Sequence, residues 1–307
     1  MFDHSSLSND MSYSDEPPIL VAGSSAACLA RAMGAIEASG RRIGASILID
    51  QASERIERQA SACALWLEID EDTGGAMDAL LAQIGNDVSA GRYAAVVSTT
   101  GALLDPVMAG LGDSDIALLI DAGEAERAAA LAIATSGSSE TLRVADVAND
   151  GTGARLRQLS DEVNRIAATL ARLSSPPAVS AFLPNGGNEA AEIPSIAPET
   201  VRSIIRARRL RGRFFSDELF ADPAWDMLLD LLQAEVSHLR VPVSSLCIAA
   251  AVPATTALRW LKSLVDQGLF IRRADPHDGR RVFVELAPDT SRALHRYFAE
   301  VERTQMI

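Results

Sequence analysis

The stretch Phe270–Leu286, FIRRADPHDGRRVFVEL, decides how the C-terminal part of the chain folds. Two runs of strand-forming residues flank a tight, polar tip that contains a glycine, and this pattern predicts a β-hairpin. Arginine pairs at 272–273 and 280–281 bracket the tip. A hairpin needs its turn, but it does not need four cations held together against their mutual repulsion. Their crowding therefore indicates a polyanionic partner.

The residues around the hairpin predict four helices and a short strand before it, with the last two helices joined as a pair by a turn, and one helix after it. Periodic apolar positions and end signals define these elements. They are a helix over Thr200–Phe215, a helix over Ala224–His238 opened by Pro223, a short strand over Val241–Val243, a helix over Leu246–Ala251 capped by Ser244 or Ser245, a turn at Val252-Pro253, a helix over Ala254–Gln267 ended by Gly268, and a helix over Thr290–Val301.

The hairpin tip is similar to the wing of MarR-type regulators, which carry the pattern D-x-R-x-x-x-V-x-L-T. The chain has Asp278, Arg280, Val284 and Leu286 at the first four fixed positions, and Ala287 stands where the pattern has threonine. The R-x-x-D-P that is common before the wing of that family is also present. The resemblance covers roughly residues 200–303, and it implies a winged helix-turn-helix that binds double-stranded DNA.

The resemblance also implies roles for individual residues. The second helix of the pair would enter the major groove, and Arg280 would enter the minor groove with its guanidinium oriented by Asp278. The implied DNA-binding residues are Ser244, Ser245, Thr255, Thr256, Arg259, Lys262, Arg273, Asp278, Arg280 and Arg281. Two other roles stay open: Arg272 could pair with Asp278 across the hairpin, and Arg259 could form a salt bridge on a solvated face.

A connecting segment over residues 154–173 carries apolar residues in the alternating spacing of three and four that lines a coiled-coil seam. The seam residues are Leu156, Leu159, Val163, Ile166, Leu170 and Leu173. This narrow stripe predicts a helix that pairs two copies of the chain, and the alternative is an amphipathic helix packed on its own domain. Since MarR-type proteins usually dimerise through long helices at both ends of the domain, the expected homodimer uses the seam, those ends or both.

The N-terminal part alternates short apolar strands with helices, which predicts a parallel sheet buried on both faces. The expected strands are Ile19–Ala22, Arg42–Asp50, Ala62–Ile69, Tyr93–Ser98 and Ile116–Asp121, and the expected helices are Ala26–Ala38, Ala52–Gln59, Ala76–Ile84, Leu103–Leu111 and Glu124–Ala134. Five such units indicate a flavodoxin-like, doubly wound α/β domain. The predicted fold class is therefore α/β plus α+β: this sheet, a coiled-coil helix and a C-terminal winged helix-turn-helix.

Shifts in composition give the expected domain boundaries. A polar, acidic and disordered tail covers residues 1–17, and the α/β domain covers 18–140. The connector with the dimerisation helix covers 141–173, and a flexible linker rich in Pro, Gly, Ser and Asn covers 174–198. The DNA-binding domain covers 199–307.

The N-terminal layout resembles the receiver domain of response regulators, in which an aspartate after the third strand is phosphorylated. Asp70 has that place here. However, the first strand runs into Ala22-Gly23-Ser24 without the acids that hold Mg²⁺ in receivers, and Asp121 follows the fifth strand where receivers have a lysine. Phosphoryl transfer needs such charges. We therefore expect a pseudo-receiver or another sensory domain for a small-molecule or protein signal, with no catalytic residue, metal or cofactor.

Charge is divided unevenly between the two halves. Residues 200–307 carry 16 Lys+Arg against 13 Asp+Glu, and the rest of the chain carries 12 against 28. This asymmetry hints at nucleic-acid contact. Three separate cysteines in apolar surroundings indicate a reducing, cytoplasmic location, and the absence of any run of 18 apolar residues argues against a membrane span.

These observations predict a dimeric, sequence-specific transcription regulator that binds DNA and is not an enzyme. Residues 18–138 contain no histidine, which argues against acid–base catalysis in the N-terminal domain. The alternative is a signalling adaptor, in which the winged helix and the pseudo-receiver both bind protein partners.

Overall fold

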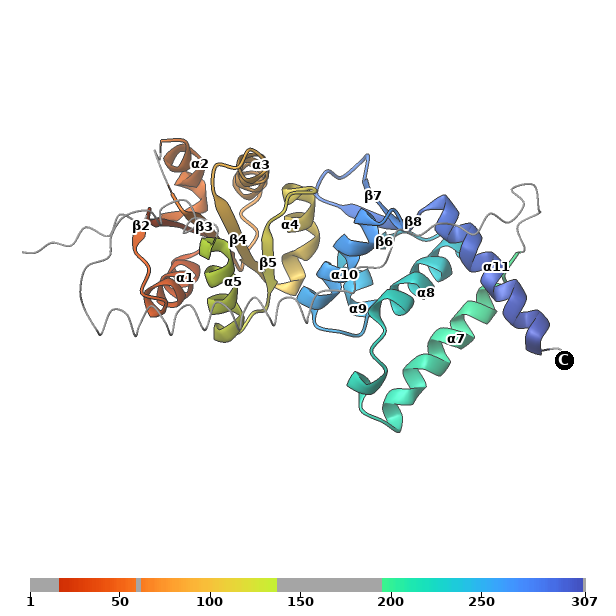
Figure 1. Cartoon of the computed structure of the whole chain (residues 1–307). Helices are drawn as coiled ribbons and strands as arrows, with labels where there is room; N and C mark the ends of the chain where they lie inside the picture. Colours follow the sequence, from red (N-terminus) through yellow and green to blue (C-terminus); the bar gives the residue numbers. More distant parts are fainter. Residues whose placement is uncertain (1–16, 59–61, 137–194, 306–307) are drawn as a thin grey trace, which may run out of the picture.

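The computed structural model describes residues 17–58, 62–136 and 195–305. They form two units that lie against each other, a sheet unit up to residue 136 and a C-terminal unit from residue 195 (Figure 1). The predicted seam from Leu156 to Leu173, the tail at residues 1–16 and the linker up to residue 194 lie outside the described residues.

Five parallel strands form the sheet, in the order β2-β1-β3-β4-β5. They are β1 (Ile19–Gly23), β2 (Ile43–Leu48), β3 (Ala64–Ile69), β4 (Ala94–Thr99) and β5 (Ala117–Ile120). Every residue of β1 and β3 is buried, as expected for strands that are covered on both faces. The edge strand β5 lies on the side of the C-terminal unit (Figure 1).

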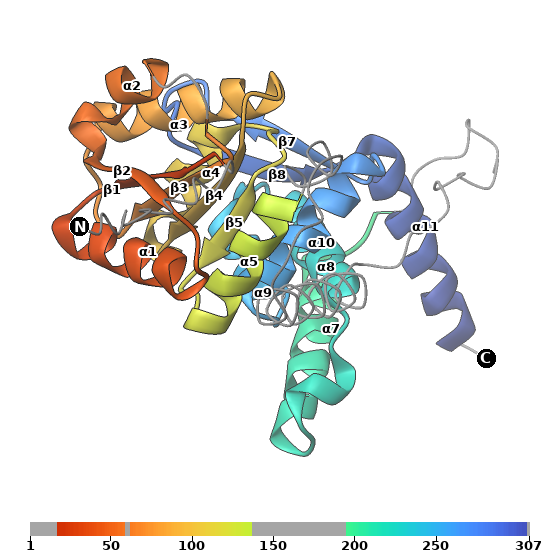
Figure 2. The same cartoon turned by 60° about the vertical axis from the view of Figure 1, so that its left-hand side comes forward.

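Helices cover both faces of the sheet (Figure 2). One face carries α1 (Ala26–Ala38) and α5 (Glu124–Ser136), and the other carries α2 (Ile49–Glu57), α3 (Gly75–Ser89) and α4 (Leu104–Leu111), which follows the 3₁₀ turn η1 (Gly101–Leu103). Alternate side chains of β1 divide accordingly, since successive residues of a strand point to opposite faces. Ile19 and Val21 pack with α1 and α5, and Leu20 and Ala22 pack with the other three helices.

Predicted and observed boundaries agree at α1 and differ at other elements. The helix α3 continues to Ser89, five residues beyond its predicted end at Ile84, and the second strand shows why such boundaries shift. The sequence extends that strand to Asp50, whereas β2 ends at Leu48 and α2 begins at Ile49. Ile49, Ala52 and Ile56 are buried and are spaced by three and four residues, so a helical apolar face begins where the strand was expected to continue.

Two glycines allow α3 and α4 to pack closely. A Cβ atom at Gly110 would lie 2.7 Å from Cβ of Leu81, and a Cβ atom at Gly85 would lie 2.9 Å from Oγ of Ser114. The Ser114 hydroxyl also donates a hydrogen bond to the carbonyl oxygen of Gly85, at 3.2 Å. This close approach, which only glycine permits, fixes the loops at the ends of both helices.

The C-terminal unit combines five helices with a small antiparallel sheet of strand order β6-β8-β7. Its elements are α7 (Pro198–Leu210), the 3₁₀ turns η2 (Arg211–Arg213) and η3 (Asp217–Phe220), α8 (Pro223–Val236), β6 (Val241–Pro242), α9 (Val243–Ala249), α10 (Ala254–Asp266), β7 (Phe270–Ala274), β8 (Val282–Leu286) and α11 (Pro288–Gln305). The side chains of Trp225, Tyr297 and Phe298 stack and meet edge to face, and they join α8 to α11.

The helix α9 starts earlier than predicted and has no serine cap. It begins at Val243, with Pro242 at the N-cap position and no capping hydrogen bond from a side chain. Ser244 and Ser245 lie in its first turn instead. The prediction that one of them caps a helix over Leu246–Ala251 is therefore wrong, because the proline has already begun the helix.

No single helix among the described residues is long and apolar enough to cross a membrane. Only α9 and α10 together, across a sharp bend, have the length and composition of a span. Their apolar residues Leu246, Leu258 and Leu261 are buried in the core of the C-terminal unit.

Candidate nucleic-acid interface

The helices α9 and α10 form a bent pair that leads directly into the β7–β8 hairpin. Residues 250–253 separate the two helices, and the bend between them is 108°. One side of α10 is buried through Ala257, Leu258, Leu261 and Leu264. Thr255, Arg259 and Lys262 lie on its other side, where they line the boundary with the sheet unit.

Four cations of the C-terminal unit lie on the side that meets the sheet unit. They are Arg259 and Lys262 of α10 and Arg272 and Arg280 of the hairpin, and we call them the basic face. The remaining predicted arginines of the hairpin, Arg273 and Arg281, are more than half exposed. The side that meets the sheet unit therefore holds three of the five predicted cations, Arg259, Lys262 and Arg280, together with Arg272.

The hairpin tip is held by its own acidic residues. Asp278 accepts a hydrogen bond from the backbone N–H of Arg280 at 3.0 Å, and its second oxygen lies 3.2 Å from Nε of Arg281. Arg273 pairs with Glu285 of the neighbouring strand. Asp278 thus orients the backbone of Arg280 and the guanidinium of Arg281, and the expectation that it orients the Arg280 guanidinium is wrong.

Arg280 reaches the sheet unit. Its Nη2 lies 2.7 Å from Oδ1 of Asp72, and its Nε lies 3.1 Å from Oδ1 of Asp78. Asp72 belongs to the loop before α3, where it also accepts from the backbone N–H of Gly74 at 2.8 Å, and Asp78 lies in the first turn of α3. Arg280 is therefore bound by two carboxylates, one from the loop before α3 and one from its first turn.

Two further cations of the basic face have acidic partners in the loop after α4. Nη1 of Arg272 lies 3.0 Å from Oδ1 of Asp113, so its partner here is Asp113 and not Asp278, the alternative that the sequence leaves open. Lys262 pairs with Asp115. We call Asp72, Asp78, Asp105, Asp113 and Asp115 the acidic face of the sheet unit.

The fifth member of the acidic face contacts the start of α9. Asp105, in the first turn of α4, accepts from the backbone N–H of Ser244 at 2.9 Å and from its hydroxyl at 2.5 Å. The same carboxylate lies near Cys247, whose pKa is raised to about 12, mainly by burial and also by the charge of Asp105. The sequence implies that Ser244 and Ser245 contact DNA phosphate. In this structure the Asp105 carboxylate accepts the hydrogen bonds of Ser244, and Ser245 is exposed.

Apolar side chains lie beneath the ion pairs. Leu104 and Ile120 of the sheet unit are buried in the same apolar cluster as the core of the C-terminal unit, with Met108 and Leu118 against it. Beside this layer is a cavity of about 690 Å³, which is lined by β5, α5 and the outward side of α10. The two units are thus joined by an apolar contact and several ion pairs, with a cavity beside them.

The contact between Asp72 and Arg280 shifts the pKa of both groups. The pKa of Asp72 is lowered, mainly by the hydrogen bond from Arg280 and secondly by that from Gly74. The pKa of Arg280 is raised in turn, with Asp72 as the largest cause. Both side chains keep more than a third of their surface in solvent. Such exposed pairs are weak and are screened by salt.

The acidic face was missed from the sequence, although the sequence carried a signal for it. The DEDTGGAMD run at 70–78 and the DSD run at 113–115 are acid-rich, and the charges of the two halves have opposite sign. This asymmetry is typical of nucleic-acid contact, but that is not its only physical consequence. Opposite charges on two adjoining domains also predict that the domains attract each other.

The carboxyl edge of the sheet, where receivers carry their phosphorylation site, holds two acids bound by arginines. Glu68 is 3% exposed, and its oxygens lie 2.7 Å from Nη1 of Arg127 and 3.4 Å from Nε of Arg31. Asp70 accepts from Nη2 of Arg31 at 2.9 Å and from the Ser24 hydroxyl at 2.8 Å. Cations of the protein itself therefore neutralise both acids.

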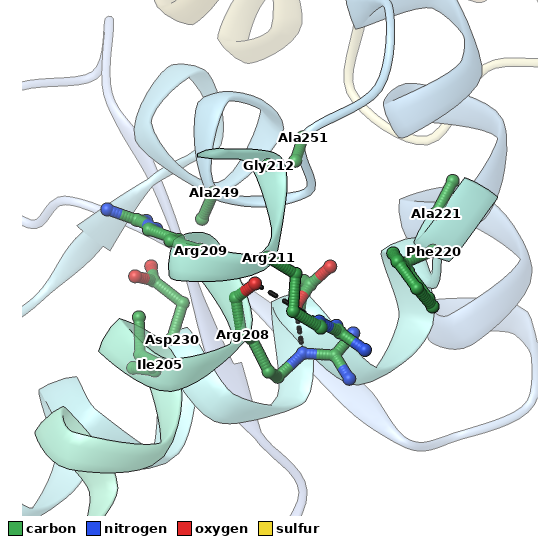
Figure 3. Close-up of a pocket in the computed structure, with 11 residues that line it drawn as sticks. Ile205, Arg208, Arg209, Arg211, Gly212, Phe220, Ala221, Asp230, Ala249 and Ala251 are labelled. Carbon is green, nitrogen blue, oxygen red and sulfur yellow. Dashed lines mark hydrogen bonds and ion pairs between the residues drawn. The ribbon is translucent and has the colours of Figure 1, made fainter. Parts of the chain in front are cut away.

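A smaller pocket of about 400 Å³ lies between α7, α8 and α9 and is rich in arginine (Figure 3). Arg208 is held by Asp226, with 2.6 Å between Nε and Oδ1. Arg209 lies beside Asp230. Burial raises the pKa of Asp230, and the charge of Arg209 partly offsets this rise. These cations have acidic neighbours within their own unit, and they tie α7 to α8.

Comparisons with known proteins add little to this geometry. No protein-family model matches the chain, and no curated protein matches it. One solved structure is similar in part: the adhesin competence repressor AdcR from Streptococcus pyogenes, at 16% identity over 36% of this chain and 77% of that one, with a TM-score of 0.23. Because that score is low, the proposals below depend on the geometry of this chain alone.

Proposed function

We propose that the chain is a sequence-specific, DNA-binding transcription regulator, with α9, α10 and the β7–β8 hairpin as a winged helix-turn-helix. The observation that carries this proposal is the bend of 108° between two short helices, followed at once by a hairpin that shares the cationic surface of α10. Helix-turn-helix pairs cross at about 90–120° over a turn of three or four residues. The second helix can then enter the major groove, while Arg280 reaches the adjoining minor groove.

The proposed role of the sheet unit is sensory. Its strand order is that of flavodoxin-like folds, which supports the doubly wound assignment. Arg31 forms an ion pair with Asp70, and Arg127 forms one with Glu68. Because these acids already have cationic partners within the protein, they support a pseudo-receiver rather than a phospho-acceptor. In this proposal the unit receives a small-molecule or protein signal and performs no catalysis.

The proposed regulator is a homodimer. The seam from Leu156 to Leu173 is its proposed pairing element, alone or together with the ends of the C-terminal unit. Two symmetry-related helix pairs would bind a pseudo-palindrome with half-sites about 34 Å apart. Sedimentation of the whole chain, compared with a variant that carries Leu159→Asp and Ile166→Asp, tests the seam, and equal sedimentation of the two would contradict it.

DNA binding is tested by selecting genomic fragments on the full-length protein, sequencing them and measuring affinity by fluorescence anisotropy. We expect one enriched sequence class and loss of affinity for it in Arg259→Ala. The matched control is Arg202→Ala, which removes the same charge from an exposed position of α7, away from the basic face. Equal affinities of the two variants for the duplex would contradict a contact between α10 and DNA.

One observation favours a second function, that of a signalling adaptor. The basic face is occupied by a protein surface, so protein partners suit it as well. The selection experiment separates the two functions, because an adaptor would enrich no DNA sequence at moderate salt and would retain no duplex at low salt.

A further inference from the structure

We infer that the acidic face of the sheet unit occupies the DNA-binding surface of the same chain, so that the closed molecule shown here does not bind DNA until the two units separate. This inference rests on the proposed function. It assigns to Asp72, Asp78, Asp113 and Asp115 the place that DNA phosphates take in the open molecule.

The ion pairs at this surface use the same chemistry as the contacts of arginine with DNA phosphates. Arginine binds carboxylate and phosphate oxygens with the same fork of N–H donors. Arg280 directs two of its nitrogens at two carboxylates, Asp72 and Asp78. The wing arginine therefore cannot enter a minor groove while these contacts hold.

The second helix of the pair is covered as well. The outward side of α10 faces the sheet edge β5 across the cavity, and Lys262 is paired there with Asp115. A major groove is about 12 Å wide and must receive this helix along that same side. The closed arrangement thus blocks both parts of the proposed DNA surface. The sheet unit covers the outward side of α10, and its carboxylates bind the arginine of the wing.

The acidic face has fixed geometry. Asp72 is held by the N–H of Gly74, whose φ of 67° places this turn at the start of α3. The close packing of α3 on α4 through Gly85 and Gly110 sets the distance between this turn and the loop that carries Asp113 and Asp115. Because Asp72 is held in advance at the position of its partner, it loses little conformational entropy on contact.

The contact is also weak enough to be reversed. The side chains of Asp113 and Asp115 are 87% and 92% exposed, so their ion pairs lie in water and are screened by salt. At the cavity beside them, side chains of the two units do not pack against each other, which weakens this part of the boundary between the units. Separation of the units therefore breaks these ion pairs, the hydrogen bonds of Asp105 with Ser244 and the apolar contact of Leu104 and Ile120.

The first test compares the affinity of the full-length chain and its variants for one fluorescent duplex. The opened variant carries Asp72→Asn, Asp78→Asn, Asp113→Asn and Asp115→Asn. The matched control carries Glu37→Gln, Asp50→Asn, Glu54→Gln and Glu57→Gln, which removes the same number of negative charges from exposed positions of α1 and α2. The duplex is the most enriched genomic fragment or, if none is enriched, a random 30-base-pair sequence.

We expect the opened variant to bind the duplex between about 5-fold and 150-fold more tightly than the wild type, the usual range of coupling between two sites. The control should gain far less, since its acids do not touch the basic face. Equal gains in both variants, or no gain in either, would overturn the inference and leave the proposed function standing.

The second test detects the closed state without DNA. Lys262 is the only lysine of the chain, so a carbodiimide can join its amine, as an amide, to the carboxylate that touches it. We expect a peptide in which Lys262 is linked to Asp115, a lower yield of that peptide when duplex is present, and no DNA binding by the linked protein. Failure of the link to form, or DNA binding by linked protein, would overturn the inference.

The two tests also separate this inference from the function on which it rests. If the link forms but neither the wild type nor the opened variant binds any duplex at low salt, the contact is real and the proposed DNA-binding function is wrong. The same result would overturn the inference, because the covered surface would not be one that binds DNA.

Discussion

Nη2 of Arg280 lies 2.7 Å from Oδ1 of Asp72, although the two residues are 208 positions apart in the sequence. The residue that the hairpin pattern assigns to the minor groove is thus bound to the loop before α3 of the other unit. In the proposed regulator Arg280 has two mutually exclusive partners, Asp72 and DNA, and this choice couples the arrangement of the units to DNA binding.

Arg280→Ala should weaken DNA binding strongly only after the units have been opened. In the variant that lacks the four carboxylates, we expect a loss of about 1–3 kcal/mol, the usual effect of removing a groove-reading arginine. In the wild type the loss should be smaller, because the substitution also removes the contacts of Arg280 with Asp72 and Asp78. Anisotropy titrations of the four proteins form a double-mutant cycle, and equal losses in both backgrounds would contradict the coupling.

Salt should affect the wild type less steeply than the opened variant. DNA affinity falls with salt in both, because binding releases counterions. In the wild type the same salt also screens the pairs of Lys262 and Arg272 with their aspartates, so part of the loss is offset. Plots of log affinity against log salt between about 50 and 200 mM check this, and a steeper wild-type slope would contradict it.

The closed state should not depend on pH between about 5 and 8. The pKa of Asp72 is lowered in the closed state by Arg280 and Gly74, so its stabilising contact is complete above the ordinary pKa of about 3.9. That contact is lost only as the pH falls through the lowered value. The ratio of DNA affinities of the opened variant and the wild type should therefore stay constant over this range, and a change of severalfold would point to another titrating group.

Gly110→Ala should destabilise the sheet unit and displace the acidic face. The new Cβ atom would lie 2.7 Å from Cβ of Leu81, so α4 must move, at a cost of about 1–3 kcal/mol. Gly34→Ala in α1 is the control, because no atom lies within 4 Å of its new Cβ and alanine favours a helix by about 1 kcal/mol. Urea unfolding of both variants measures the difference, which should have opposite sign in the two.

Local patterns were enough to predict most elements of both units. The α1 boundaries follow from a strand, a small-residue turn and Gly40, and the hairpin follows from its alternating strands and polar tip. The partners of Arg272, Arg280 and Lys262 could not be predicted in this way. Each lies more than a hundred residues away, and no periodicity or spacing relates a loop of one unit to a strand of another.

Asp70 should not accept a phosphoryl group. Hydrogen bonds from Cys28 and Arg31 hold its pKa far below the ordinary value, and hydroxyl groups of Ser24 and Ser25 also donate to its oxygens. To attack a phosphoryl group, an oxygen of Asp70 would first have to give up its hydrogen bonds with Arg31 and the serine hydroxyls. Incubation with acetyl phosphate and Mg²⁺, followed by intact mass measurement, should show no phosphoryl adduct. An adduct on the wild type that is absent from Asp70→Asn would contradict this prediction and make the sheet unit a working phospho-acceptor.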